Sequence, residues 1–158
     1  MSVLRIAWCG PEAAATVHAL TQAAFAPYGS LKPPSTALRE TVEIVRTDLE
    51  QARGLVAHLD ELPVAAARTL TLDNHLHLRR LAVHPDYQRR GLATAVMHWV
   101  QDQAISLGYE EIRLGARNAL PANRALYENL GYRAVMDHGF WTEFRLDLRP
   151  YSPNGPQR

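Results

Sequence analysis

Two arginines and a glycine follow an apolar run in the middle of the chain, Leu81-Ala82-Val83-His84-Pro85-Asp86-Tyr87-Gln88-Arg89-Arg90-Gly91-Leu92-Ala93-Thr94. The pair Pro85-Asp86 is typical of a turn, and amphipathic helical spacing resumes at Leu92. The first N–H groups of a helix have no carbonyl partner within it, and the helix dipole is positive at that end. Residues 89–94 therefore predict a binding site for an anion such as phosphate.

Two familiar phosphate loops do not match this segment. It lacks the Gly-Lys-Ser/Thr of a Walker loop and the second and third glycines of a dinucleotide fingerprint. An ordinary junction of strand, turn and helix, with two solvated arginines, is the alternative interpretation.

The elements that must position this loop follow from apolar spacing and from turn residues. We expect strands over 3–9, 54–59, 64–72, 76–83, 111–116, 132–136 and 141–148, and helices over 11–25, 36–50, 92–107 and 121–130. The short connections among the strands of 54–83 imply an antiparallel meander. This order predicts an α+β fold, with a mixed, mostly antiparallel central sheet of about seven strands flanked by about four helices.

Composition limits the class of protein. A chain of 158 residues with 47% hydrophobic content is the size of one globular domain, which we expect over 1–149. Residues 150–158 are rich in turn formers and predict a flexible tail. The net charge of +1 argues against a nucleic-acid partner, and no apolar stretch is long enough for a membrane span. A single cysteine, Cys9, fits a cytoplasmic location.

Two motifs point to one family when they are taken together. The first is Gln88-Arg89-Arg90-Gly91-Leu92-Ala93, and the second is Leu126-Tyr127-Glu128-Asn129-Leu130-Gly131-Tyr132. Their sequences and order resemble those of the GNAT superfamily of acyl-CoA-dependent N-acyltransferases, and the order of elements over 3–148 is similar to the family's. The resemblance implies transfer of an acetyl group from acetyl-CoA to a primary amine of a small molecule or peptide, by direct attack in a ternary complex, with no metal.

The resemblance also implies which residues meet the cosubstrate. The pantetheine arm would lie beside Leu81–Val83, where an N–H near Leu81 or Ala82 would face the thioester carbonyl. Tyr127 would protonate the departing thiolate, with simple ring packing as the alternative, and Asn123 lies one turn earlier on the same helical face. The implied cofactor-binding set is Leu81, Ala82, Val83, Gln88, Arg89, Arg90, Gly91, Leu92, Ala93, Thr94, Asn123 and Tyr127.

The chain departs from the family pattern on the strand before Leu81. Many members carry a glutamate there as general base, whereas this chain reads Leu76-His77-Leu78-Arg79-Arg80. His77 is the best candidate for the base, and a half-exposed strand histidine is the alternative. A metal held by His75 and His77 is disfavoured because no third ligand is near. The missing carboxylate keeps a second function open, a noncatalytic module that binds or senses acyl-CoA.

Residues 25–50 and the final strands are expected to shape the acceptor site. We expect Arg79 and Arg80 to point to opposite faces of their strand as surface charge, with contact of one of them to a substrate carboxylate or to the cofactor as the alternative. Glu40, Glu43 and Asp48 are interpreted as a solvated helix face. A homodimer through edge strands of the sheet is a further possibility.

Overall fold

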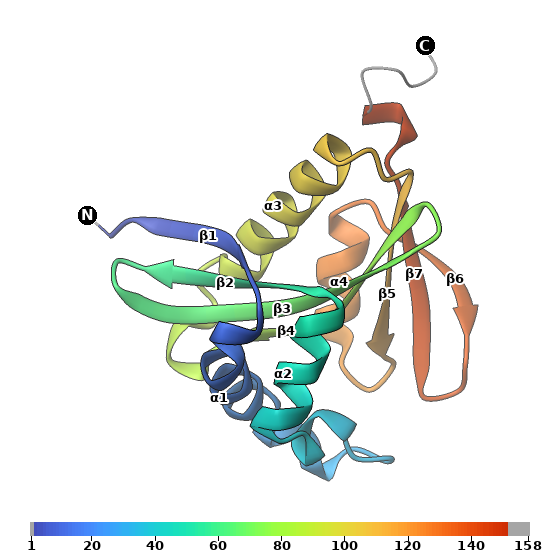
Figure 1. Ribbon diagram of the computed structural model, residues 1–158. Coiled ribbons are helices and arrows are strands. Elements are labelled where there is room, and N and C mark those ends of the chain that lie inside the picture. Colours follow the sequence, from blue (N-terminus) through green and yellow to red (C-terminus); the bar gives the residue numbers. More distant parts are fainter. Residues whose placement is uncertain (1, 152–158) are drawn as a thin grey trace. The chain divides into compact units, whose positions relative to one another are not determined.

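The computed structural model describes residues 2–151, and this part of the chain forms a seven-stranded sheet and four α-helices (Figure 1). The strand order is β1-β2-β3-β4-β5-β7-β6. β4 and β5 pair in parallel, whereas β1 with β2, β2 with β3, β5 with β7 and β6 with β7 pair antiparallel. The strands are β1 (Leu4–Cys9), β2 (Arg53–Leu59), β3 (Leu62–Leu72), β4 (His75–Val83), β5 (Glu111–Arg117), β6 (Arg133–Asp137) and β7 (Trp141–Asp147). The predicted fold class and the mostly antiparallel sheet are confirmed.

Apart from the start of α2, the described α-helices begin and end close to the predicted positions. They are α1 (Ala14–Phe25), α2 (Val42–Gln51), α3 (Leu92–Ser106) and α4 (Pro121–Asn129). By contacts the chain divides into two compact units, Met1–Leu70 with Arg79–Met97, and Thr71–Leu78 with His98–Arg158. The single domain expected over 1–149 stays a prediction. Of the expected tail, residues 152–158 lie outside the described residues, and Arg149–Tyr151 form a 3-10 turn.

The first unit is built by packing α1 and α2 against β2 and β3. Apolar residues recur at helical spacing along both helices, so that one face of each helix is buried. The strands are instead buried over continuous runs, 54–57 on β2 and 64–69 on β3, and therefore on both faces. The core they share consists of Ala14, Val17, Leu20, Val45, Leu49, Val56 and Ala66. Full burial of a Val or Leu side chain contributes about 1.5–3 kcal/mol, so this cluster fixes where α2 lies on the strands.

The second predicted helix was wrong at its start. Instead of one helix over 36–50, a short 3-10 helix, Thr36–Arg39, is followed by extended backbone at Glu40 and then by α2. The hydroxyl of Thr41 accepts a hydrogen bond from the N–H of Ile44 at 3.2 Å and so caps α2. A threonine cap competes with continued helix, and this competition places Glu40 in the connection rather than on the helix.

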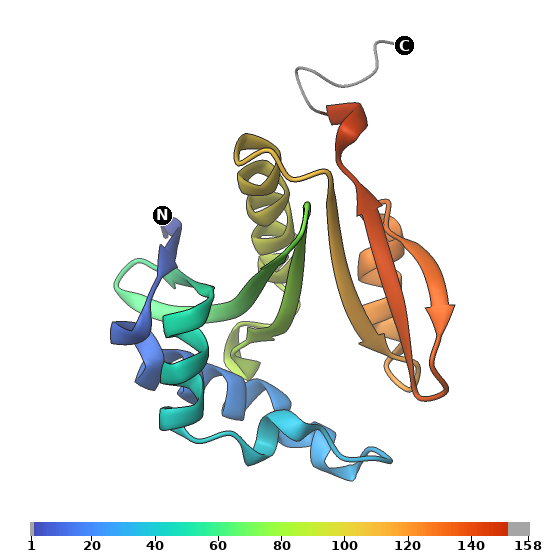
Figure 2. The same ribbon diagram turned by 45° about the vertical axis from the view of Figure 1, so that its right-hand side comes forward.

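The second unit places α4 against one face of β5 and β7 (Figure 2). On these strands buried residues alternate with more exposed, mostly charged ones, and the buried set is Ile112, Leu114, Ala116, Thr142, Phe144 and Leu146. Gly131 ends α4 with a φ of 94°, a left-handed backbone that glycine adopts without strain. The N–H of Tyr132 then donates to the carbonyl of Tyr127 at 3.0 Å. This turn directs the chain from α4 into β6.

Candidate functional site

A tight turn joins β4 to α3 in the first unit. The 3-10 helix Pro85–Tyr87 follows β4 almost directly. The ring Nδ1 of His84 accepts a hydrogen bond from the N–H of Asp86 at 3.2 Å, and the side-chain amide of Gln88 donates to the carbonyl of Val83 at 3.1 Å. These two contacts hold the start of the loop against the end of β4.

The loop then passes through two residues with left-handed backbone. Arg89 has a φ of 64° and Gly91 a φ of 77°. Left-handed residues within a turn can direct successive N–H groups toward one side, which is the geometry of an anion-binding concavity. The N–H of Ala95 donates to the carbonyl of Gly91 at 3.0 Å as α3 begins. Three backbone N–H groups precede that bond and lie outside the helical ladder, those of Leu92, Ala93 and Thr94.

The two arginines give this loop its charge. Both side chains are exposed, and the guanidinium of Arg90 lies 5.1 Å from the centroid of the Tyr87 ring. A cation over an aromatic face is oriented while its charge stays accessible. Backbone N–H groups together with two guanidinium groups are the donors that a diphosphate requires, so the residues present fit that part of coenzyme A.

β4 has an irregular backbone just before the segment Leu81–Val83. Arg80 has a φ of 56° although it is not glycine, a conformation that costs about 1–2 kcal/mol and persists where the surroundings fix it. Ala82 and Val83 are buried beyond this point, and Leu81 is half-buried. The N–H implied to face a thioester carbonyl therefore directly follows a bend in the strand. That role of Leu81 or Ala82 stays a prediction.

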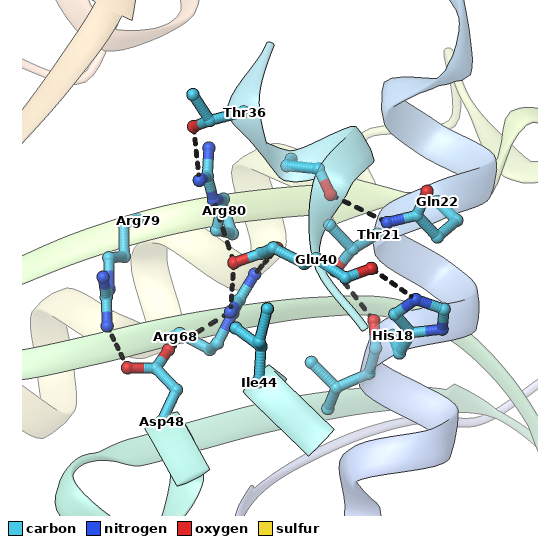
Figure 3. A network of polar contacts seen from close by, with 12 residues as sticks. His18, Thr21, Gln22, Thr36, Glu40, Ile44, Asp48, Arg68, Arg79 and Arg80 are labelled. Carbon is cyan, nitrogen blue, oxygen red and sulfur yellow. Dashed lines mark hydrogen bonds and ion pairs between the residues drawn. The ribbon is translucent and has the colours of Figure 1, made fainter. Parts of the chain in front are cut away.

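A buried arginine on β3 lies at the centre of a charged cluster in the same unit (Figure 3). The side chain of Arg68 is 1% exposed and donates to both carboxylate oxygens of Glu40, at 2.9 and 2.7 Å. Its Nη1 also donates to Oδ2 of Asp48 at 3.2 Å. The side chains of Glu40 and Asp48 are only 13% and 18% exposed. The predicted solvated face was wrong for these two residues, because both carboxylates turn inward to Arg68.

The two arginines of β4 join the same cluster. Arg79 forms an ion pair with Asp48, while Nη2 of Arg80 donates to the hydroxyl of Thr36 at 2.9 Å and its Nε lies 3.7 Å from Glu40. The prediction that these arginines point to opposite faces as surface charge was wrong. Regular alternation holds only for uninterrupted strands, and the left-handed backbone at Arg80 interrupts this one.

Sequence reasoning missed Arg68, although a signal for it was present. It follows Val64-Ala65-Ala66-Ala67 inside a strand that was predicted from its apolar character. An arginine within such a run is buried with the strand and therefore needs carboxylate partners. The presence of Glu40 and Asp48 on the predicted helix could have suggested the pairing.

The second unit holds the tyrosine of the second motif. Tyr127 is buried on α4, and its ring centroid lies 5.9 Å from that of Tyr132 and 6.2 Å from that of Phe144. Burial, and secondarily Tyr127, raise the pKa of the Tyr132 phenol. Asn123 is half-buried one turn earlier on the same helix. The aromatic packing proposed as the alternative for Tyr127 is therefore present, while its part in proton transfer stays a prediction.

His77 also belongs to the second unit, at the end of β4 that pairs with β5. It lies in register with Arg113 and is half-buried. Its neighbour on the same face, His75, is buried, and desolvation lowers the pKa of its imidazole. Within residues 2–151 no group of three or more His, Cys, Asp or Glu side chains is placed to hold a metal ion.

A family model described as the acetyltransferase (GNAT) family matches residues 17–132. An N-acetylaspartate synthetase from Xenopus tropicalis is 36% identical over 72 residues, which is 46% of this chain and 27% of that protein. The corresponding protein from Danio rerio is 33% identical over 72 residues, 46% of this chain and 26% of its own. The chain thus spans about a quarter of the length of these curated relatives.

Solved structures share the fold at low sequence identity. The PaiA N-acetyltransferase from Thermoplasma acidophilum, in complex with coenzyme A, has a TM-score of 0.81 at 15% identity, covering 92% of this chain and 99% of that one. The ribosomal-protein-S18-alanine N-acetyltransferase from Escherichia coli has a TM-score of 0.79 at 20% identity, covering 99% of both chains. In the part of the chain that the structure describes, no helix has the length and apolar content of a membrane span.

Proposed function

This chain belongs to the GNAT acetyltransferase family, and on that premise we propose that it transfers an acetyl group from acetyl-CoA to a primary amine by direct attack in a ternary complex. The loop between β4 and α3 carries the proposal. The donors for a diphosphate would be the free N–H groups at the start of α3 and the exposed side chains of Arg89 and Arg90. The left-handed backbone at Arg89 and Gly91 supports an arrangement of N–H groups around an anion.

The cosubstrate would then be bound by the residues that the first motif predicts. The proposed set in the first unit is Leu81, Ala82, Val83, Gln88, Arg89, Arg90, Gly91, Leu92, Ala93 and Thr94. The N–H of Leu81 or Ala82 would donate to the thioester oxygen as it gains negative charge, which lowers the barrier to attack. The amine nitrogen bonds to the carbonyl carbon, the carbon–sulfur bond breaks, and the thiolate leaves with the electron pair.

Two proton transfers complete the reaction. The attacking amine must lose a proton, and we assign its acceptance to His77, because a neutral imidazole can accept a proton as a general base. The leaving thiolate gains a proton, and we assign its delivery to the hydroxyl of Tyr127, with Asn123 as a hydrogen-bonding partner of the cosubstrate. The family motif that contains Tyr127 supports this assignment.

The acceptor is a small molecule or a peptide with a free amine. The curated relatives are named for acetylation of aspartate, and one structural neighbour for acetylation of an alanine on a ribosomal protein. Both names describe an amine close to a carbonyl or carboxylate carbon. For this chain we also propose a cytoplasmic location, in keeping with its single free cysteine, and leave a homodimer through edge strands as a prediction.

Release of free CoA thiol across a panel of amines tests the proposal. We expect saturable thiol release with at least one amine, and acetylated product in equal amount by mass spectrometry. The alternative function is a noncatalytic module that senses acyl-CoA, which is favoured by the lack of Asp or Glu in residues 75–83. Tight acetyl-CoA binding in calorimetry without turnover of any amine would support that module and refute catalysis.

A further inference from the structure

The charged cluster in the first unit contains more positive than negative groups. Its ion pairs join three arginines, Arg68, Arg79 and Arg80, to two carboxylates, those of Glu40 and Asp48. If all five are charged, the cluster has a net charge of +1. Uncompensated charge away from water is unfavourable, so such a cluster favours binding of an anion.

The excess charge lies on β4 and not on β3. The charge of Arg68 is paired, because its two Nη atoms hold Glu40 through two hydrogen bonds and Asp48 through a third, although its Nε is a buried donor without a partner among residues 2–151. The carboxylates of Glu40 and Asp48 therefore both accept hydrogen bonds from the buried arginine. Asp48 also pairs with Arg79. Arg80 is left with the weakest carboxylate contact in the cluster.

The guanidinium of Arg80 is available to a ligand. Its side chain is 24% exposed, and its Nε is 3.7 Å from Glu40, too far for a hydrogen bond. Its Nη2 donates to the neutral hydroxyl of Thr36. Burial lowers the pKa of Arg80, and the charges of Arg68 and Arg79 act in the same direction against those of Glu40 and Asp48. Nearby, Nε of Arg79 is a buried donor without a partner among residues 2–151.

We propose that Arg80, with Arg79 beside it, binds a carboxylate of the acceptor, and that the acceptors of this chain are amines that carry a carboxylate. This inference rests on the proposed function. Arg80 directly precedes Leu81, so the guanidinium extends from the residue next to the proposed oxyanion donor. Because the carboxylate carbon of an α-amino acid is two bonds from its nitrogen, an amino acid held by Arg80 keeps its amine close to the guanidinium.

The same anion chemistry could come from a phosphate group of coenzyme A. The two sources differ in what the variants would change, since a phosphate contact would alter cosubstrate affinity and a carboxylate contact would alter acceptor affinity only. We commit to the carboxylate, because the loop arginines Arg89 and Arg90 are separate from this cluster in sequence and already fit the phosphates.

The test compares Arg80→Gln with the wild-type protein and with Arg46→Gln. The side chain of Arg46 on α2 is 40% exposed and pairs with Glu43 one turn away, so it controls for loss of one positive charge in the same unit. The ligands are L-alanine, compared with its carboxamide, and L-aspartate, compared with its dicarboxamide, so that each amide retains the amine and lacks every charged carboxylate. Thermal unfolding in the presence of coenzyme A measures binding, and thiol release measures turnover.

We expect the amino acids, at about ten times their Kd, to raise the Tm of wild type and Arg46→Gln by about 3–6 °C. The carboxamides should give no shift, and Arg80→Gln should lose the shift while binding coenzyme A normally. In turnover, Arg80→Gln should raise KM for the acid at least about tenfold, the loss expected for a charge-assisted hydrogen bond. Arg80→Lys, which keeps charge without the planar fork, should lie in between.

Equal shifts with acid and carboxamide, absence of any shift in wild type, or an unchanged shift in Arg80→Gln would overturn the carboxylate site. Weakened binding of coenzyme A by Arg80→Gln would assign the arginine to the cosubstrate instead. Failure of the proposed function can be told apart from failure of the carboxylate site. If the chain is not an acetyltransferase, thiol release is absent with every amine, whereas the Tm shift with the amino acids still tests the carboxylate site.

Discussion

Removal of the charge on Glu40 should destabilise the first unit by an amount that the geometry allows us to work out. Glu40→Gln keeps the volume of the side chain but withdraws the carboxylate that accepts two hydrogen bonds from Arg68 at 2.9 and 2.7 Å. Breaking a buried ion pair costs about 3–5 kcal/mol, because an uncompensated charge is left behind. Asp48 remains 3.2 Å from Arg68, so we expect the lower end, about 3 kcal/mol.

Denaturant unfolding followed by circular dichroism measures this loss. For a chain of this length about 3 kcal/mol corresponds to a fall in Tm of about 6–12 °C. Glu43→Gln is the matched control on the same segment, since the Glu43 side chain is 80% exposed in its pair with Arg46 and should contribute at most about 0.5 kcal/mol. A loss below about 1 kcal/mol for Glu40→Gln, or one equal to the control, would refute the reasoning.

A second substitution separates the charge from the contacts. In Arg68→Met combined with Glu40→Gln, the buried cation is removed together with its partner, and a flexible apolar side chain takes its place. We expect this double variant to be more stable than Glu40→Gln alone, because replacement of a whole buried pair is often neutral. Additive losses would show that the two residues contribute independently and that the unpaired charge is not the cause.

Three further predictions concern the loop, the tyrosine and the cysteine. Gly91→Ala should weaken acetyl-CoA binding in calorimetry about tenfold, because alanine is strained at a φ of 77°. Gly108→Ala, at a φ of 86° just past the far end of α3, is the control and should leave the affinity for acetyl-CoA unchanged. Equal affinities of the two variants for acetyl-CoA would refute the assignment of the loop. Tyr127→Phe should lower kcat at least about tenfold with little change in KM if the hydroxyl protonates the thiolate, whereas equal turnover would reduce Tyr127 to packing. Burial, with a smaller effect of Glu12, raises the pKa of Cys9 to about 11. At pH 8 its thiol should therefore react with iodoacetamide about a hundredfold more slowly than free cysteine. Comparable alkylation rates of Cys9 and free cysteine by mass spectrometry would contradict this.

Most of the fold could be predicted from local patterns because its elements end at strong signals. Gly91, Gly108 and Gly131 each have a positive φ at a helix boundary, where the sequence predicted one. The exception is the segment 36–50, where apolar spacing continues across a break. Spacing does not report that the Thr41 hydroxyl caps α2 or that Glu40 turns toward Arg68. Both are outcomes of local competition and tertiary contact.

The candidate site could be predicted only where a motif carried it. The glycine loop has a chemical requirement, backbone approach to an anion, that is visible as residue types in order. The charged cluster has no such signal in the order of its residues, because Glu40, Asp48 and Arg68 are brought together by the packing of α2 on β3. Ion pairs between residues 20 and 28 positions apart have no periodic signature.

The backbone at Arg80 connects the charged cluster with the strand segment Leu81–Val83 that leads into the glycine loop. Had β4 stayed regular, Arg79 and Arg80 would project from opposite faces, and one of them would be separated from Asp48 and Glu40. The left-handed φ of 56° is what allows both to join one cluster. Contacts of Arg80 with Thr36 and Glu40 can in turn offset the strain of that conformation. A carboxylate bound at Arg80 would therefore be held by the residue that also sets the course of β4 into Leu81, so acceptor recognition and the proposed oxyanion donor would depend on a single turn of the backbone.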